Sequence, residues 1–266
     1  GRIVKKDELK AREFYERASI LGYREAYSVI GSGYRYGEGG YPQDTERSIT
    51  FLKLGAELDC KWGLCYLGSC YEEGYGVPQD YVKAAVYYTK SADLYYNAAQ
   101  ANLGQLYENG LGVIKDTVKA REYYQQAART GSKFSRYRLG LCYLNGIGGE
   151  KDFFEAMYNF EIGANGKHKH STREYYICEK TFSRNISSLW DELNHSAENG
   201  SSYAKYQLGV CYMEGKNTEP DYEKGVKLFR EAIEGGYKLA ETALNRYRLQ
   251  WVTKTKKSAS SSSFTM

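Results

Sequence analysis

The sequence predicts an all-α fold, a right-handed α-solenoid in which stacked helix pairs repeat with a period of about 36 residues. Two series carry this prediction. Aspartates recur at steps of 36 residues, at Asp44, Asp80, Asp116 and Asp152. A Leu-Gly pair, followed three residues later by tyrosine, recurs at the same step, with its glycine at Gly68, Gly104 and Gly140. Tyrosine is as frequent as glycine, 28 residues each among 266, because the repeat places it systematically.

Composition excludes several classes of protein. With 42% apolar and 26% charged residues, the chain can bury a sizeable core and is unlike a disordered chain. No apolar run approaches the roughly 18 residues of a membrane-spanning helix, so we expect no direct membrane insertion. The net charge of +4 comes from 37 basic and 33 acidic residues scattered along the chain. Lys254-Thr255-Lys256-Lys257 is the nearest approach to a basic stripe, so we expect no nucleic-acid partner.

The first helix of each unit has the pattern small-x-x-x-Leu-Gly-x-x-Tyr, as in Ala99, Leu103, Gly104 and Tyr107. Steps of four residues place the alanine, leucine and tyrosine on one stripe of a helix. Glycine inside a helix costs about 1 kcal/mol relative to alanine. Its recurrence at one position predicts that the backbone of a neighbouring helix packs directly against it.

The second helix begins at the repeated aspartate. Asp80 is expected to cap it, and apolar or small residues follow at steps of three and four, at Ala84, Tyr87, Tyr88, Ser91 and Ala92. Gly-x-Gly-Val segments at 74–77 and 110–113 lie between the two helices, where glycine ends one helix and permits a turn. Because these loops follow helices and recur in each repeat, we do not interpret them as phosphate-binding loops.

This pattern resembles the Sel1-like repeat family, which is related to the tetratricopeptide repeats. The resemblance is carried by Leu103-Gly104-x-x-Tyr107-x-x-Gly110-x-Gly112-Val113 and then Asp116-x-x-Lys119-Ala120-x-x-Tyr123-Tyr124-x-x-Ala127-Ala128-x-x-Gly131. Residues 67–92 match in the preceding unit and 139–164 in the following one, and residues from about 7 to 250 fit the scheme. The resemblance implies a scaffold, as in membrane-protein degradation, regulation of cell-wall synthesis, signalling and host–microbe interaction.

We divide the chain into a solenoid over 1–252 and a Ser-rich tail over 253–266 that we expect to be disordered. The solenoid consists of a half repeat (5–21), units at about 23–58, 59–94, 95–131, 132–166 and 201–236, a degenerate unit (167–200) and a capping helix (237–251). The half repeat and the missing initiator methionine suggest a fragment of a larger protein.

The degenerate unit has Tyr175-Tyr176 where Leu-Gly is expected, and it lacks the Gly-x-Gly-Val loop. Its second helix survives as Leu189, Leu193 and Ala197. Two interpretations are open, a diverged spacer repeat or a specialised docking site. We favour the spacer, because divergence needs no selection.

The cysteines and histidines do not form a metal or catalytic set. Cys70, Cys142 and Cys211 share a position with Leu106, which indicates a small apolar packing site and reduced thiols. Certain bacterial relatives carry two cysteines per repeat, and that pattern is missing here. His168, His170 and His195 lack further ligands at suitable spacing, so we expect no metal and no cofactor. Reduced thiols favour the cytoplasm, with the ER lumen or secretory route as the alternative if an upstream signal precedes this chain.

In the tetratricopeptide scheme the first helices line a concave face. Transferring that register predicts the partner-binding residues Arg35, Tyr36, Trp62, Glu72, Glu73, Gln105, Glu108, Asn109, Leu141 and Asn145. The glutamates lie near helix C-termini, where the helix dipole disfavours them, so they are candidates for function or else solubilising helix-end charges. Such a groove should bind a basic or aromatic segment. Relatives that bind acidic C-terminal tails use basic groove residues, and their absence here argues against that ligand class.

The sequence therefore predicts a non-enzymatic adaptor, a monomer that presents a concave helical groove to a protein or peptide partner. One alternative is a regulatory segment of a larger enzyme, for example one linked to a kinase. A third hypothesis is a β-lactam-binding hydrolase, against which the missing paired cysteines count.

Overall fold

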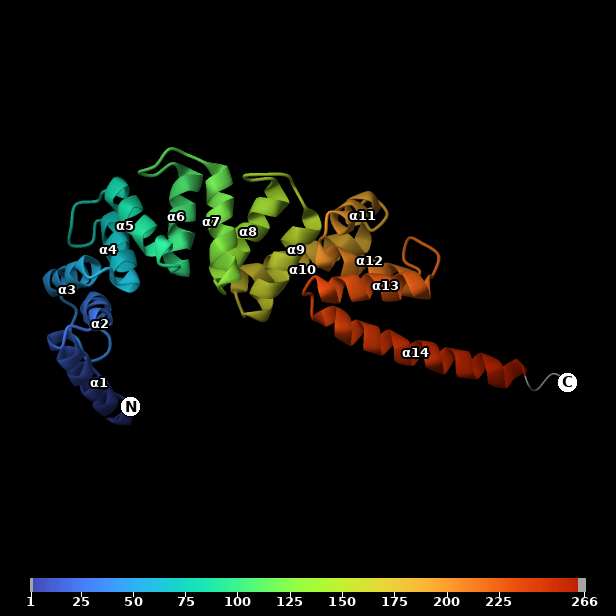
Figure 1. The fold of residues 1–266 in the computed structure, drawn as a ribbon, viewed down its shortest axis with the longest axis horizontal. Helices are drawn as coiled ribbons and strands as arrows, with labels where there is room; N and C mark the ends of the chain where they lie inside the picture. Colours follow the sequence, from blue (N-terminus) through green and yellow to red (C-terminus); the bar gives the residue numbers. More distant parts are fainter. Residues whose placement is uncertain (1, 263–266) are drawn as a thin grey trace. The chain divides into compact units, whose positions relative to one another are not determined.

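The computed structural model describes the backbone of residues 2–262 and the side chains of residues 7–250. This part of the chain contains fourteen helices and no strand, which confirms the predicted all-α solenoid (Figure 1). The helices are α1 (Arg2–Ile20), α2 (Arg24–Tyr36), α3 (Thr45–Glu57), α4 (Lys61–Glu73), α5 (Tyr81–Asp93), α6 (Asn97–Asn109), α7 (Thr117–Arg129), α8 (Lys133–Asn145), α9 (Phe153–Asn165), α10 (Lys169–Arg184), α11 (Trp190–Glu198), α12 (Ser202–Glu214), α13 (Tyr222–Glu234) and α14 (Leu239–Ser262). Among the described helices, none is long and apolar enough to cross a membrane.

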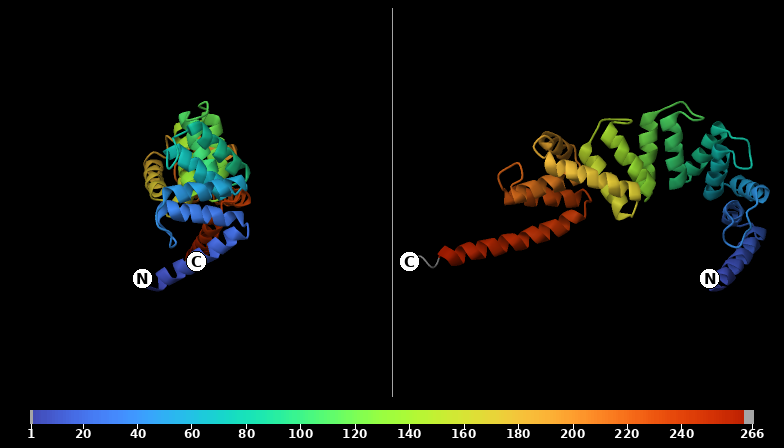
Figure 2. Two further views of the ribbon diagram at one scale, coloured as in Figure 1. Left: turned by 90° about the vertical axis from the view of Figure 1, so that its left-hand side faces the viewer. Right: turned by 180° about the vertical axis from the view of Figure 1, so that it is seen from behind.

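The chain divides into two compact units, which are described separately. The first comprises Gly1–Leu139 and Ile147–Gly149, and the second comprises Gly140–Gly146 and Glu150–Met266. Within the first unit each helix from α1 to α7 packs against the next (Figure 2). Helix α2 also contacts α4. Within the second unit α9 packs against α10, the helices from α11 to α14 pack in succession, and α9 also contacts α11 and α12.

Local signals set the ends of the helices as the sequence predicts. The carboxylate of Asp80 accepts a hydrogen bond from the backbone N–H of Lys83 at 2.9 Å, and the aspartates that precede α3, α7 and α13 do the same three residues on. At the other end of the first helices, α4 ends at Gly74 in the left-handed conformation, φ 73°. Gly112 also has a positive φ, and a Cβ there would lie 2.2 Å from the carbonyl carbon of Tyr81, so no larger residue fits.

The repeated helical glycine has a different neighbour from the one we expected. A Cβ on Gly104 would lie 2.8 Å from Cε1 of Tyr124, and one on Gly68 would lie 2.8 Å from Cδ1 of Tyr88. The nearest backbone atom to the Gly68 Cβ is the Ala84 carbonyl oxygen, at 3.4 Å. The expected backbone contact is therefore secondary: a backbone carbonyl approaches Gly68 and Gly209, but the aromatic ring lies closer. An aromatic ring from the second helix lies across the first helix, and glycine leaves room for the ring.

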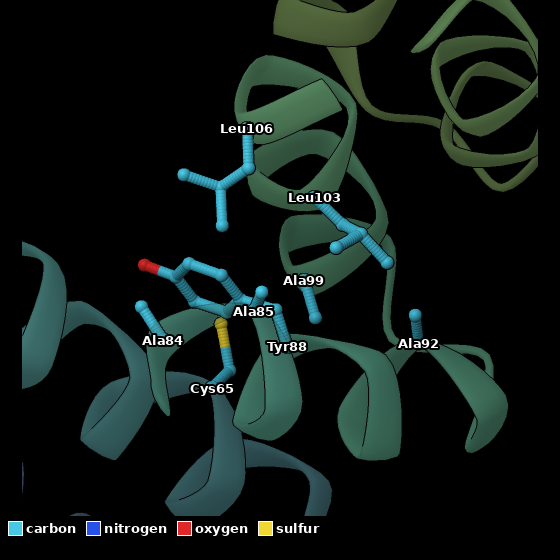
Figure 3. Close-up of a cluster of buried hydrophobic side chains, with 8 residues drawn as sticks. All are labelled: Cys65, Ala84, Ala85, Tyr88, Ala92, Ala99, Leu103 and Leu106. Atoms are coloured by element: carbon cyan, nitrogen blue, oxygen red, sulfur yellow. The ribbon is translucent and has the colours of Figure 1, made fainter. Parts of the chain in front are cut away.

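The core lies between consecutive helices of each unit. Side chains of α4, α5 and α6 converge around the ring of Tyr88, which is fully buried (Figure 3). All six cysteines are buried and none forms a disulfide, and the burial of Cys70, Cys142 and Cys211 agrees with the packing position predicted for them. Burial raises the pKa of the Cys65 thiol to about 12 and that of Cys70 to about 11, so both stay protonated at neutral pH.

The degenerate unit forms two helices, α10, which packs against α9, and α11, which packs against α12 and α9. Its irregular Tyr175 directs its hydroxyl to Oε1 of Glu161 on α9, at 3.4 Å, and Oε2 of the same carboxylate accepts a hydrogen bond from Tyr237 at 2.8 Å. Burial raises the pKa of Glu161 above its ordinary value. A polar and aromatic contact between α9, α10 and the residues before α14 therefore replaces the usual Leu-Gly packing.

The backbone of α14 remains helical as far as Ser262, beyond the expected helix end at 251 and through much of the tail that we expected to be disordered. Residues 254–259 contain lysine and alanine and lack glycine and proline, so they carry no helix-breaking signal. Residues 263–266 of the expected tail lie outside the described part of the chain.

Candidate partner-binding surface

The ten predicted partner-binding residues all lie on first helices of the repeats. Eight belong to the first unit, on α2, α4 and α6, and Leu141 and Asn145 belong to the second unit, on α8. The eight are therefore considered as one surface. Asn109 and Asn145 lie at equivalent positions in their units, and each is exposed and donates its side-chain N–H to the carbonyl four residues earlier.

Arg35 is buried, although we expected it to face a partner. Only 4% of its side chain is exposed, and its guanidinium pairs with Oε2 of Glu73 at 2.8 Å. It also donates to Oγ of Ser69 at 3.2 Å and lies over the rings of Tyr36 and Tyr75. Because Arg35 is on α2 and Glu73 is on α4, this ion pair joins consecutive repeats.

Glu72 and Glu108 also make contacts within the fold. The hydroxyl of Tyr88 donates to Oε2 of Glu72 at 2.6 Å, and that of Tyr124 donates to Oε2 of Glu108 at 2.7 Å. Arg138 forms an ion pair with the same Glu108 oxygen. Burial, followed by the hydrogen bond to Glu108, raises the pKa of the Tyr124 phenol well above its ordinary value. Each glutamate thus satisfies a buried phenol of its own helix pair.

The sequence contains a signal for this contact that we did not use. Glutamate and tyrosine are 16 residues apart in both pairs. In other repeats the same spacing joins Leu144 to Phe160 and Met213 to Phe229. These four side chains have no hydroxyl or carboxylate, so no polar contact is needed there. The carboxylate therefore occurs in these units only where the ring carries a hydroxyl.

Trp62 lies beside a hollow in the surface of the first unit. This hollow has a volume of about 230 Å³ and is lined by Ser28, Val29, Ser32, Trp62 and Tyr66, from α2 and α4. Tyr66 follows Trp62 by one helical turn and was not among the predicted residues. A second hollow, of about 210 Å³, is lined by Ala11, Tyr15, Val29, Ser32, Gly33, Glu38, Gly39 and Tyr41.

The two hollows share Val29 and Ser32, so they form one continuous surface over α1, α2 and α4. We call it the aromatic groove. Its walls are the rings of Tyr15, Trp62 and Tyr66, and Glu38 supplies an exposed carboxylate at one end. Such a surface can accept an apolar or aromatic side chain beside a cation.

Among the described side chains, no group of three or more His, Cys, Asp or Glu could hold a metal ion. His168 instead caps α10, since its ring nitrogen lies 3.3 Å from the backbone N of Ser171. His195 lies 2.9 Å from the amide nitrogen of Asn199.

Comparisons with known proteins place the chain among repeat proteins. A search of curated proteins found no match. The structure is similar to the crystal structure of a protective antigen present in uropathogenic Escherichia coli strains that displays an SLR fold, with a TM-score of 0.60 and 27% identity over 90% of this chain and 52% of that one. The chain thus spans about half the length of that protein. A Sel1 repeat protein from Oxalobacter formigenes shares the fold, with a TM-score of 0.52 and 22% identity over 91% of this chain and 85% of that one.

A family model described as Sel1 repeat matches six segments, at residues 1–23, 25–60, 63–96, 97–132, 134–168 and 202–237. The matched segments cover most of the chain and leave out residues 169–201, which contain α10 and α11. Sel1 repeats are generally non-catalytic scaffolds for protein interaction. The chain belongs to the Sel1 repeat family.

Proposed function

We propose that the chain is a non-enzymatic scaffold whose first unit binds a peptide segment of a partner protein in the aromatic groove. The observation that carries this proposal is the continuity of the two hollows, which share Val29 and Ser32 and are walled by Tyr15, Trp62 and Tyr66. Peptides bind where aromatic side chains offer apolar area in a concave surface, and aromatic residues commonly dominate the affinity.

The chemistry of the groove favours a segment with an aromatic residue next to a basic one. An aromatic ring would pack against Trp62 and Tyr66, and a cation would pair with Glu38. Glu38 forms no ion pair among the described side chains, whereas Glu73 is already paired with Arg35. The specificity for basic segments is therefore assigned to Glu38 rather than to Glu72, Glu73 or Glu108.

The test selects peptides from a random display library on the full chain. We expect the selected peptides to contain an aromatic residue with a lysine or arginine nearby. Replacing both Trp62 and Tyr66 with alanine should weaken them about tenfold or more, because each large ring contributes buried apolar area. The matched control replaces Tyr23 and Tyr95, which are 61% and 80% exposed and lie outside the groove.

Equal affinity for the groove variant and the control variant would contradict the proposal. Glu38→Lys is the appropriate charge test, and it should weaken basic peptides while leaving peptides that lack a cation unchanged. Glu72→Lys is unsuitable, because it would leave the Tyr88 hydroxyl without its acceptor and so perturb the fold.

We also propose that the chain works as a monomer in a reducing compartment such as the cytoplasm. The compartment is supported by the burial of all six thiols, none of which forms a disulfide. Sedimentation of the pure chain and thiol counting on material isolated from its native source would test the two statements.

A further inference from the structure

The basic residues of α10 lie along one face of the helix. Lys169, Arg173, Tyr176, Lys180 and Arg184 follow one another at steps of four, three, four and four residues, which places them in one row along the helix. All five are exposed. With a rise of 1.5 Å per residue, the row is about 22 Å long. We call it the α10 basic stripe.

The opposite side of α10 anchors the helix. Ser171 and Cys178 are buried, and the ring centre of Phe182 lies 5.3 Å from that of Phe154 on α9. These residues, together with Tyr175, recur at steps of four, three and four, out of phase with the stripe. The packing against α9 therefore holds the basic stripe facing away from the core.

The cations of the stripe have no acidic partner among the described side chains. None of the four takes part in an ion pair, and Lys180 lies 5.9 Å from the ring centre of Tyr176. The acidic residues of α10, Glu174 and Glu179, lie on the two flanks of the stripe at 100° per residue. Elsewhere in the chain, partly buried cations such as Arg138 and Lys205 are paired with glutamate.

The stripe is not a requirement of the repeat. The regular first helices carry fewer cations than the four of the stripe, since α6 has no lysine or arginine, α4 has one, α2 has two and α8 has three. The family model also omits residues 169–201. The four cations thus lie in a segment that departs from the family pattern.

We propose that the α10 basic stripe binds an acidic segment of a partner protein, with Tyr176 contacting an apolar residue of that segment. Four cations in a row about 22 Å long complement a segment that carries carboxylates along one side. The apolar centre, formed by Tyr176 (62% exposed) and Ile177 (45% exposed), fits a peptide better than a phosphate backbone.

This inference goes beyond the aromatic groove and does not depend on it. Of our two interpretations of residues 167–200, it favours a specialised docking site over a diverged spacer repeat. We overlooked basic residues on a first helix because the predicted groove residues were taken from the regular repeats.

The test titrates the full chain with a fluorescein-labelled peptide of aspartate and glutamate around one phenylalanine, followed by fluorescence anisotropy. Arg173→Glu together with Lys180→Glu should weaken binding about tenfold, because two attractive charge pairs become repulsive. The control, Arg230→Glu with Lys238→Glu, makes the same change in net charge at exposed residues of the same unit and should leave binding unchanged. Tyr176→Ala should weaken binding about threefold. Circular dichroism checks that all variants keep equal helicity.

Three results would overturn the proposal. The first is no saturable binding by the unchanged chain, and the second is equal weakening in the stripe and control variants. The third is stripe-dependent binding to a DNA duplex or to phosphatidylserine vesicles in place of the peptide. Replacing Trp62 and Tyr66 with alanine should leave the acidic peptide bound as before, which separates this proposal from that of the aromatic groove.

Discussion

The helix pairs of the repeats are of two kinds that share one backbone arrangement. In both kinds an aromatic ring of the second helix lies across a glycine of the first, but the side chain that meets the far end of the ring differs. In α6–α7, Tyr124 lies across Gly104 and its hydroxyl meets Glu108. In α12–α13, Phe229 lies across Gly209 in the same way, and Met213 stands at the position of the glutamate. The repeat therefore fixes the shape of the contact, an aromatic ring over a glycine. Whether the contact at the end of the ring is polar depends on two positions together, the ring itself and the residue four positions after the glycine.

The largest expected change in stability tests the feature that both kinds of helix pair share, the glycine beneath the ring. Gly104→Ala and Gly209→Ala should each destabilise the chain by on the order of 1–3 kcal/mol, and the leucine variants by at least as much, because the ring must move. The sign is diagnostic, since alanine in place of glycine normally favours a helix by about 1 kcal/mol. Urea unfolding followed by circular dichroism measures the change. Glu122→Ala, at an exposed position of α7, serves as the control and should stay within about 0.5 kcal/mol.

An increase in stability for either glycine variant would break the comparison, because it would mean that the ring does not occupy the space above the helix.

A smaller change in stability tests the feature that distinguishes the two kinds of helix pair, the hydrogen bond between a glutamate and a tyrosine. Glu72→Leu and Tyr88→Phe should each cost about 1–3 kcal/mol, because each leaves a partly buried polar group without its partner. The double variant has the apolar character of the α8–α9 and α12–α13 pairs. It should cost less than the sum of the single variants, with a coupling of about 1 kcal/mol in a double-mutant cycle. Strictly additive changes would show that the two side chains do not interact.

The smallest expected effect concerns pH. Burial, followed by the Glu72 carboxylate, raises the pKa of the Tyr88 phenol well above the ordinary value of about 10. The folded chain therefore holds this proton more tightly than the unfolded chain does. Its contribution to stability is complete below about pH 10 and is lost as the pH rises toward the folded pKa.

Alkaline titration should accordingly show part of the phenolate absorbance appearing together with the loss of helicity. In the Tyr124→Phe variant, the free energy of unfolding should fall less steeply with pH above about 10, because one phenol of raised pKa has been removed. An unchanged slope would argue that Tyr124 ionises within the folded chain.

The features that recur in every repeat could be predicted from the sequence. The side-chain contacts between the two helices of a repeat could not. The capping aspartates, the glycine turns and the helix pairs repeat, so four copies reinforce one another. The Glu72–Tyr88 contact joins two helices through a loop, and its register depends on loop length rather than on helical period. For the same reason, the partner of Gly104 was assigned to backbone instead of to Tyr124.

The candidate surfaces were predicted only in part. Trp62 was identified from the repeat register, whereas Tyr66 was not, although it lies on the same face. Arg35 was expected on the surface, but a buried guanidinium cannot be recognised without knowing that Glu73 lies on the adjacent helix. The α10 basic stripe was missed because basic residues were sought as consecutive runs, such as 254–257, and not at helical spacing.

The carboxylate–phenol contact also bears on how such a chain can evolve. Both partners lie within one repeat, so duplication of a whole unit copies a complete contact into the new repeat. Conversion of one kind of unit into the other by single substitutions must instead pass through a chain with an orphaned polar group. Descent by copying entire units is thus the less costly route. For the same reason, a whole repeat, from the start of its first helix to the end of its second, could be inserted into another solenoid with this contact intact.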